Sequence, residues 1–488
     1  MLKLLVLKEM HTYFSSPKFV MVFSICSMLM LLSVFLGIQE YQTSVAQYNT
    51  GTQLALQDLR ERNSWMDAGM RVFREPDPMQ IFVTGISNDI GRISNISEWE
   101  EIKLRHSPYS DDPIFAAFRF LDFSFIIQVV FSLLAILFTF DAVSGERESG
   151  TLKLIFANAV PRTRYLVSKF IGSWLGLFVP LLIPLLLSLL LILLYNIRFD
   201  SDHWFRLMFL IVISALYYTF FILCGIAVSA LTRTSATSFL SLLVLWVLLV
   251  LIIPRISVLS AANVITVPGA AETDARIDGF STERWKQYEK TLTAVWERRN
   301  NEMTGMNKEE RKAYEDERMW QWMEEDEQNR HAIQSDISEF ARKLKEDVRN
   351  RKEQQQNLAF SLSRFSPASA FSLAAMNLAG NGIDMKPRYE KAMDDYKNIF
   401  NEFIKTKREE NKSSGGIRIT FDSENGFSFQ TADMKKMLDT SELAEFVQPK
   451  LTLADIISYA IIDFSIILFA CLMAFTISWV AFLRYDLR

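Results

Sequence analysis

Three polar side chains lie within strongly apolar stretches, and their chemistry stands out first. Asp463 lies in the last apolar stretch, and Asp122 and Gln128 lie in the outer part of an earlier one. A carboxylate at mid-membrane costs roughly 2.5–3.5 kcal/mol on insertion scales, so it usually faces a partner or water. One interpretation is a polar lining of a translocation path, or a packed contact that sets a gate. The alternatives are a local pair of Asp122 with Arg119 and a shallow position for Asp463.

Two prolines, Pro180 and Pro184, lie within another apolar stretch. Proline lacks a backbone N–H and frees a carbonyl one turn earlier, so both residues allow a kink in a helix. Such a kink serves gating or adapts the packing of the helix, and the sequence leaves both interpretations open.

Familiar catalytic motifs are absent from the sequence. It contains no GxxxxGK[ST] phosphate loop, so ATP binding by that route is not expected. Four histidines without HExxH argue against a zinc hydrolase, and there is no GxSxG elbow. The cysteines Cys26, Cys224 and Cys471 fall in apolar runs, which indicates small buried side chains rather than disulfides. A missing motif does not exclude catalysis, but nothing in these residues argues for it, and we expect no metal site and no cofactor in this chain.

The composition indicates a membrane protein with a substantial water-exposed part. The chain has 488 residues, of which 50% are hydrophobic and 22% charged. It is too apolar for an ordinary soluble enzyme and too charged for a protein that lies wholly within the membrane. The net charge of -4 lacks the basic excess that nucleic-acid binding normally requires, so we expect no nucleic-acid partner.

Six apolar stretches are long enough to cross a hydrocarbon core of ~30 Å, which takes ~20 helical residues. The predicted spans are 19–38, 117–140, 170–197, 204–231, 238–256 and 454–482. A cleaved signal peptide is the alternative for the first, but no clean small-x-small site follows it. Residues 1–18 are predicted as an amphipathic helix at the inner surface, and 483–488 as a tail. The predicted fold class is an α-helical polytopic membrane protein with a mainly helical extracytoplasmic domain that contains a small β-hairpin.

The cations of the short loops predict the orientation of the chain. They cluster in residues 1–18 and 141–169, whereas a short loop on the opposite side has only Arg198 and Arg206. By the positive-inside rule, both termini and the segment 141–169 face the cytosol. The polar segment 39–116 then forms a small extracytoplasmic subdomain.

A large extracytoplasmic domain is predicted at 257–452, because long insertions translocate largely regardless of their charge. Alternating apolar residues around Asn425-Gly426 predict a hairpin. In the small subdomain we expect a helix near 54–70 and a strand at 81–86. Apolar residues at intervals of three or four predict helices in the large domain at 285–296, 333–348 and 389–403.

The polar segment 141–169 joins two of the most apolar stretches. Gly145 is expected to break the outgoing helix, after which Thr151 serves as an N-cap and Pro161 as a stop. We expect a short amphipathic helix on the cytosolic face, preceded by the charged trio 146–148. An ordinary cationic inner loop, which any multi-pass protein needs, also fits the pattern. The helical spacing i, i+3, i+4 and i+7 is met by Leu152, Ile155, Phe156 and Ala159.

The same segment resembles the signature region of ABC-2-type transporter permeases. Within FTFDAVSGERESGTLKLIFANAVPRTRYLVSKFIG, a span ends in an acidic residue, a small-Gly-Glu-charged-Glu-x-Gly-Thr-Leu run follows, and Pro-Arg leads into the next span. In that family this segment is similar to the coupling helix that docks into a groove on a separate ATPase subunit. The resemblance implies that the contact is formed by Glu146, Arg147, Glu148, Gly150, Thr151 and Leu152.

The resemblance also implies an assembly. The chain would be the permease subunit of a bacterial ABC transporter in the inner membrane, paired with a second or homologous permease. Two copies of an ATPase subunit would bind ATP and magnesium. The large outer domain and SPASAFSLAAMNLAG at 366–380 resemble a sub-branch related to the permease of nitrous-oxide reductase maturation. Such a permease exports a substrate or passes ATP-driven motion to an extracytoplasmic partner protein.

Other classes of function stay open. A membrane-anchored sensor would bind a ligand in the outer domain, but it needs a cytosolic output domain that the short inner segments do not provide. A membrane enzyme would hold its active site in the same outer domain. An ion-driven carrier would use Asp463, and its transport would be insensitive to ATP depletion.

Overall fold

The structure is a computed structural model that describes residues 2–62, 65, 68–97, 102, 104–106, 122–158, 160–410, 417–422, 426–431 and 438–483. Contacts divide the chain into two compact units. Unit 1 comprises Met1–Ile252 and Arg364–Arg488, and unit 2 comprises Ile253–Ser363.

Among the described residues, six helical stretches are long and apolar enough to cross a membrane. This confirms the predicted α-helical polytopic class. The stretches are α2 (Pro17–Glu61), α5 to α7 (Phe123–Glu148), α9 (Arg162–Leu194), α10 (Ser201–Leu231), α11 to α12 (Ser235–Val264) and α17 (Leu453–Leu483).

Helix α2 continues well past the first predicted span and enters the small subdomain. Its last turns bury Ala55 and Leu59, and Leu59 belongs to a second apolar cluster with Trp65 and Met70. The helix ends at Glu61 and is followed by antiparallel strands β1 (Gly69–Phe73) and β2 (Ile93–Ser97), so the helix predicted up to residue 70 ends earlier.

The strand predicted at 81–86 is wrong. The chain there forms the short 3-10 helix η1 (Pro78–Ile81), whose first turn is capped by Asp77, and then a series of turns. Phe82 and Val83 are buried next to each other, and Gly85 has a positive φ of 54°. A regular strand would place Phe82 and Val83 on opposite faces, so the apolar run reflects irregular burial in the core.

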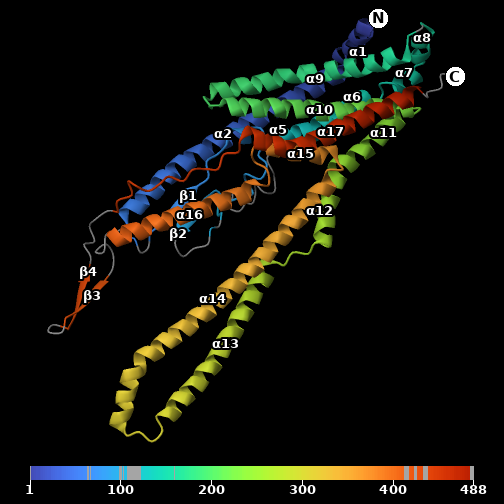
Figure 1. Ribbon diagram of the computed structural model, residues 1–488. Coiled ribbons are helices and arrows are strands. Elements are labelled where there is room, and N and C mark those ends of the chain that lie inside the picture. The colour runs from blue at the N-terminus through green and yellow to red at the C-terminus, as the bar shows by residue number, and fades with distance from the viewer. Residues whose placement is uncertain are drawn as a thin grey trace. The chain divides into compact units, whose positions relative to one another are not determined.

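Helix α1 (Leu2–Phe14) packs against α9, as Figure 1 shows. Two glycines permit this approach. A Cβ on Gly172 would lie 2.5 Å from the Cβ of Glu9, and one on Gly176 would lie 2.9 Å from the Tyr13 ring. The Tyr13 hydroxyl and Ser173 Oγ are hydrogen-bonded at 2.7 Å. The amphipathic helix predicted at 1–18 is therefore also packed on a span.

Helix α15 (Pro367–Leu378) lies against α10 and α17 within unit 1 (Figure 1). The Phe371 ring is fully buried and stacks on Tyr217 with ring centroids 4.7 Å apart. Small side chains let the helix fit closely, because Ala368, Ala370 and Ala374 are fully buried. Within the segment 257–452, which is predicted as one outer domain, residues up to Ser363 belong to unit 2 and those from Arg364 onward belong to unit 1.

Unit 2 is built from α12 (Ile253–Val264), α13 (Ala270–Glu302) and α14 (Lys308–Ser363). Helices α13 and α14 run antiparallel, with Phe280 stacked on Phe340 at 4.1 Å and Arg284 paired with Asp336 at 2.7 Å. The helices predicted at 285–296 and 333–348 are confirmed within them.

The remaining elements belong to unit 1. Helix α16 (Met385–Glu410) confirms the third predicted helix and buries Tyr389, Met393, Tyr396 and Phe400. Strands β3 (Ile417–Asp422) and β4 (Gly426–Thr431) pair antiparallel, which confirms the predicted hairpin. Asn425 of the predicted turn lies outside the described residues.

Candidate functional site

The segment 141–169 folds into two short helices and the start of α9. After α6 (Ser132–Thr139), the chain turns at 140–143 and forms α7 (Ser144–Glu148) and α8 (Thr151–Ala157). The helical break thus precedes Gly145, which lies inside α7. Helix α8 ends before Pro161, which instead caps the start of α9.

Gly150 separates α7 from α8. Its φ of 74° is left-handed, and it occupies the N-cap position of α8, so the prediction of Thr151 as N-cap is wrong. Glycine adopts this conformation without the steric cost that a Cβ would add. The Thr151 hydroxyl instead donates to the Glu146 carbonyl at 3.2 Å, which fastens the turn between the two helices.

Glu146 is the centre of a cluster of charges that joins three helices. Its carboxylate accepts hydrogen bonds from Lys8 Nζ at 2.7 Å, Lys169 Nζ at 2.9 Å and Tyr165 OH at 2.5 Å. Lys169 Nζ also bonds Glu9 Oε2 at 3.0 Å. These contacts link α7 to α1 and to α9.

The cluster balances two carboxylates against two ammonium groups. The Lys169 residue is only 4% exposed, and an unpaired charge at such a position would cost several kcal/mol, roughly, in desolvation. Burial alone lowers the pKa of Lys8, but the hydrogen bond to Glu146 and its charge outweigh burial and raise that pKa above its ordinary value. We refer to Lys8, Glu9, Glu146, Tyr165 and Lys169 as the Glu146 cluster.

Glu148 holds α7 to the start of α11 (Ser235–Trp246). Its carboxylate accepts hydrogen bonds from the Ser235 N–H at 3.1 Å and from Ser235 Oγ at 2.6 Å. A carboxylate is favourable at a helix N-terminus, where backbone N–H groups lack partners. At the other end of α7, the N–H groups of Val143 and Ser144 each donate to Ser229 Oγ of α10 at 3.0 Å.

Helix α8 has one buried face and one exposed face. Leu152 is 2% exposed, and Ile155 and Phe156 pack partly buried against the main core. On the other face, Leu154 is 65% exposed and Lys153 beside it is also exposed. The predicted amphipathic pattern is therefore confirmed for these side chains, while Ala159 lies outside the described residues.

The six residues that the resemblance implies as contacts fall into different environments. Glu146 and Leu152 point inward, and Glu148 bonds to α11, whereas Gly150 and Thr151 are exposed. Arg147 is half-buried. We define the α8 surface as the exposed residues on the turn and helix: Ser149, Gly150, Thr151, Lys153 and Leu154.

Asp463 is fully buried in the fold. Its two oxygens accept hydrogen bonds from Arg364, at 2.5 Å from Nε and 3.1 Å from Nη2. This two-point geometry is the strongest arrangement that arginine and a carboxylate form. Because Arg364 directly precedes the segment that leads into α15, the pair fastens α15 to α17.

Gln128 also bonds to the beginning of α15. It lies in η2 (Ile126–Phe131), a π-helical segment, and its Nε2 donates to the Ala368 carbonyl at 3.3 Å. The backbone carbonyl of Gln128 accepts the Tyr217 hydroxyl at 2.9 Å. The structure therefore brings Gln128 and Asp463 to the same helix, α15, through separate contacts.

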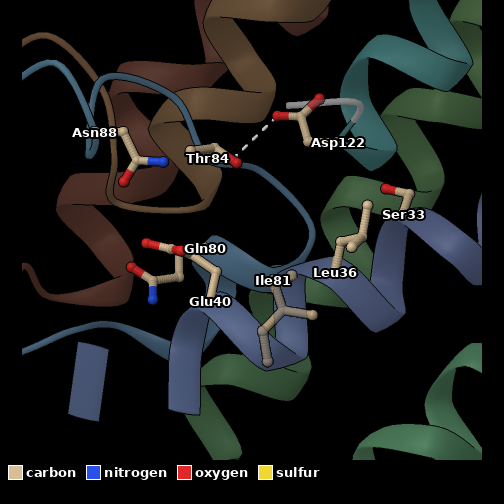
Figure 2. Close-up of a pocket in the computed structure, with 9 residues that line it drawn as sticks. Ser33, Leu36, Glu40, Gln80, Ile81, Thr84, Asn88 and Asp122 are labelled. Carbon is tan, nitrogen blue, oxygen red and sulfur yellow. Dashed lines mark hydrogen bonds between the residues drawn. The ribbon is translucent and has the colours of Figure 1, made fainter. Parts of the chain in front are cut away.

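Asp122 has a local structural role. Figure 2 shows it near Thr84, whose N–H donates to Asp122 Oδ2 at 3.1 Å. The other oxygen caps α5 (Phe123–Phe125) by accepting the Phe125 N–H at 2.8 Å and Ser124 Oγ at 2.9 Å. The adjoining cavity is only about 20 Å³. The alternative partner Arg119 lies outside the described residues.

Pro180 and Pro184 are both buried inside α9. The helix continues without interruption from Arg162 to Leu194, so neither proline ends it. Their buried position agrees with the interpretation that the prolines adapt the packing of α9. It is also compatible with bending of α9 at these two residues.

Sequence reasoning missed the partners that bind the predicted residues. Glu9, Tyr165 and Lys169 complete the Glu146 cluster, and Arg364 completes the pair with Asp463. The available signal was weak. Lys169 is an isolated cation at the edge of an apolar run, and Gly172 and Gly176 follow at the spacing of one helix face.

Within the described residues, no three His, Cys, Asp or Glu side chains gather as a metal site, and Cys26, Cys224 and Cys471 are buried free thiols.

Comparisons with known proteins place the chain in a family. No curated protein matches the sequence. A family model described as ABC-2 family transporter protein matches residues 4–487. Because this match covers nearly the whole chain, the protein belongs to the ABC-2 family of transporter proteins.

Proposed function

We propose that this chain is the permease subunit of a bacterial ABC transporter and that a separate ATPase subunit binds it at the α8 surface. Membership of the ABC-2 family supports the permease role. The observation that carries the proposed contact is the position of the α8 surface. Exposed Leu154 and Lys153 lie on α8, and Glu146 of the preceding helix α7 bonds to α1 and α9 through the Glu146 cluster.

The bonds of α7 and α8 support a mechanical role for this segment. Closure of the ATPase subunits on ATP would push on the α8 surface and move α7 with it. Glu146 accepts charged hydrogen bonds from α1 and α9, and Glu148 accepts hydrogen bonds from α11. A displacement of α7 would therefore tilt several spans together, since these contacts are short and partly enclosed.

The buried polar residues of the spans would respond to that tilt. We propose that the Arg364–Asp463 pair and the Gln128 contact hold α15 in one of two positions and so set a gate in the translocation path. Pro180 and Pro184 would let α9 bend as the gate moves. Asp122 would keep the adjoining turn in place as a cap.

The assembly follows the family pattern. Two permeases, identical or homologous, would associate with two ATPase subunits that bind ATP and magnesium. The chain would lie in the bacterial inner membrane with both termini and 141–169 in the cytosol, and with 39–116 and 257–452 outside. It would export a substrate or act on an extracytoplasmic partner, as in the sub-branch related to nitrous-oxide reductase maturation.

Co-purification tests the proposed contact. The full-length chain with an affinity tag is isolated from its native membranes, and associated polypeptides are identified by mass spectrometry. We expect a polypeptide with a GxxxxGK[ST] phosphate loop, and we expect Leu154→Glu to lower its yield about tenfold or more, since a loss of ~1.4 kcal/mol suffices. Replacing Glu146 or Glu148 would instead test the internal bonds of the chain.

Val447→Glu is the matched control. Val447 is 80% exposed and lies outside the candidate spans, so the same apolar-to-acidic change should leave the ATPase yield unaltered. An ATPase subunit retained equally by the Leu154 variant and by the unaltered chain would overturn the proposed contact. Absence of any ATPase subunit from both preparations would overturn the permease proposal.

A further inference from the structure

A polar cavity of about 520 Å³ lies within unit 1, away from the α8 surface. Its wall comes from several segments: the turn at 74–80, the start of α10, helix α16 and the stretch 448–451. Arginines and carboxylates both line it, so the pairing of each charge determines what the cavity is able to bind.

Four carboxylates line the cavity, those of Glu75, Asp77, Asp200 and Asp202, and the last of these and Asp77 form ion pairs with an arginine of the wall. Asp77 and Asp202 both pair with Arg206, at 3.1 Å and 2.6 Å, and His203 lies 3.6 Å from Asp77. Arg206 is thereby neutralised at the start of α10. These four groups interact with one another, and Arg74 and Arg388 form no ion pair with them in the described part of the chain.

Two of the less exposed cations of the wall, Arg74 and Arg388, have no carboxylate within ion-pair distance in the described part of the chain. Arg74 is 7% exposed, and its guanidinium donates only to the Ser87 carbonyl at 2.7 Å and Met385 Sδ at 3.4 Å. Arg388 makes one long bond, from Nη2 to the Gly380 carbonyl at 3.4 Å. Its Nε and Nη1 are buried with no hydrogen-bond acceptor among the residues described.

Tyr389 adds a third donor to the same wall. It is 2% exposed, and its hydroxyl has no hydrogen-bond partner within the described ranges. The Arg74 guanidinium lies 6.0 Å from the centre of its ring. A buried donor without an acceptor costs roughly 1–3 kcal/mol, and here such donors gather around one cavity.

Burial also disfavours the two positive charges. It lowers the pKa of Arg74 to about 10 and lowers that of Arg388 below its ordinary value. An anion in the cavity would reverse this cost by supplying acceptors and negative charge together. Exposed Arg198 and Lys450 line the same cavity and would attract an anion to it.

We propose that this cavity binds a phosphate group, with Arg74, Arg388 and Tyr389 as its donors. A phosphate monoester carries a charge of about −1.5 to −2 and three acceptor oxygens, which match two guanidinium groups and one hydroxyl. A single carboxylate would neutralise only one of the arginines. The phosphate belongs either to a lipid head group or to a soluble molecule, and the site does not depend on ATPase binding.

The test uses the purified full-length chain. Inorganic phosphate is titrated calorimetrically into the protein in an uncharged detergent, with chloride as the reference anion. In a second arm, the chain is reconstituted into phosphatidylcholine discs with or without phosphatidic acid, and retained lipid is measured by native mass spectrometry. Arg388→Gln and Tyr389→Phe are compared with Lys386→Gln, an exposed position on the same helix that does not line the cavity.

We expect Arg388→Gln to weaken phosphate binding about tenfold or more, which corresponds to ~1.4 kcal/mol, and Lys386→Gln to leave it unchanged. Tyr389→Phe should weaken binding while leaving the melting temperature equal or higher, because it removes a hydroxyl that has no partner in the free protein. Weaker phosphate binding without a lower melting temperature would show that the Tyr389 hydroxyl binds the ligand and does not stabilise the fold.

Binding in the first arm alone assigns a soluble ligand, and retention of phosphatidic acid assigns a lipid head group. Failure of the unaltered chain to bind either probe overturns the proposal. Equal binding by the Tyr389 and Lys386 variants also overturns it, even if Arg388→Gln does not fold. A failed ATPase co-purification would leave these measurements unaffected, so the two proposals fail separately.

Discussion

At the scale of single residues, the charges of this protein matter through their partners. Asp463 is fully enclosed, whereas the Arg364 side chain is 27% exposed. Removing Arg364 leaves the charge of Asp463 enclosed, whereas removing Asp463 leaves the charge of Arg364 partly exposed to water. The Arg364–Asp463 pair therefore allows a prediction in which the two single variants are not equivalent.

We expect Arg364→Gln to lower the melting temperature more than Asp463→Asn. The first variant leaves a buried carboxylate without its cation, at a cost of about 3 kcal/mol, whereas the second leaves a cation that water can reach. Thermal unfolding in detergent measures both. The double variant should recover part of the loss, and simple addition of the two losses would contradict a direct interaction.

The Glu146 cluster gives a second prediction at this scale. Glu146→Gln keeps the shape of the side chain but leaves two ammonium groups facing only Glu9, so we expect a loss of about 2 kcal/mol in the free energy of unfolding. Tyr165→Phe removes one hydrogen bond and should cost about 1 kcal/mol. Chemical denaturation compares the two. A Glu146 variant as stable as the unaltered chain would show that the cluster does not hold α7 in place.

At the scale of elements, Gly150 sets the direction of α8 relative to α7. A residue with a Cβ costs about 1–2 kcal/mol in the left-handed region, and asparagine tolerates it best. No atom lies within 4 Å of the space that a Cβ would fill, so the cost comes from the backbone alone. Substitutions here change the turn without creating a clash.

We expect Gly150→Val to lower ATPase co-purification, because relief of the strain reorients the α8 surface. Gly150→Asn should retain most of the yield. The comparison controls for the loss of glycine itself, since both variants add a side chain at an exposed position. Equal yields from the two variants would show that the turn does not position the contact.

The sequence predicted the elements whose signal is local. Long apolar runs predicted the spans, and repeats of three to four residues predicted α13, α14 and α16. The helix predicted near 54–70 overlaps the last turns of α2, but the continuous helical path through 39–53 was missed. The strand predicted at 81–86 failed because an apolar run reports burial and not backbone geometry.

The candidate site was predictable only in part, for a related reason. The amphipathic pattern of α8 predicted which side chains are buried. The inward position of Glu146 was not predictable, because Lys8 lies 138 positions away in the sequence. The burial of α15 was missed as well, since its alanines carry no periodic polar face, and Arg364 lies 99 positions from Asp463. Both cases depend on pairings that only the folded chain brings together.

At the scale of the whole molecule, the two compact units predict separable stability. The pairs Phe280–Phe340 and Arg284–Asp336 lie nearer the base of the α13–α14 hairpin than its connecting turn. Replacing residues 290–330 with a short Gly/Ser linker should keep both pairs. We expect the shortened chain to insert in membranes and to retain its ATPase subunit, because those residues belong to unit 2, whereas the α8 surface belongs to unit 1.

Co-purification and thermal unfolding of the shortened chain check this prediction. A melting temperature close to that of the full-length chain is the expected result. A chain that is degraded, or that no longer binds the ATPase subunit, would show that the hairpin supports the spans directly. In that case the α13–α14 hairpin would contribute to the stability of unit 1 as well as to that of unit 2.

Cross-linking in intact membranes tests the proposed contact between the α8 surface and an ATPase subunit without relying on purification. A photoreactive p-benzoylphenylalanine replaces Leu154, and the same residue replaces Val447 as the control. We expect a light-dependent adduct between position 154 and a polypeptide that contains a phosphate loop, with no such adduct from position 447. The contrary result is an ATPase adduct from position 447 alone, or none from position 154 in membranes that contain the ATPase.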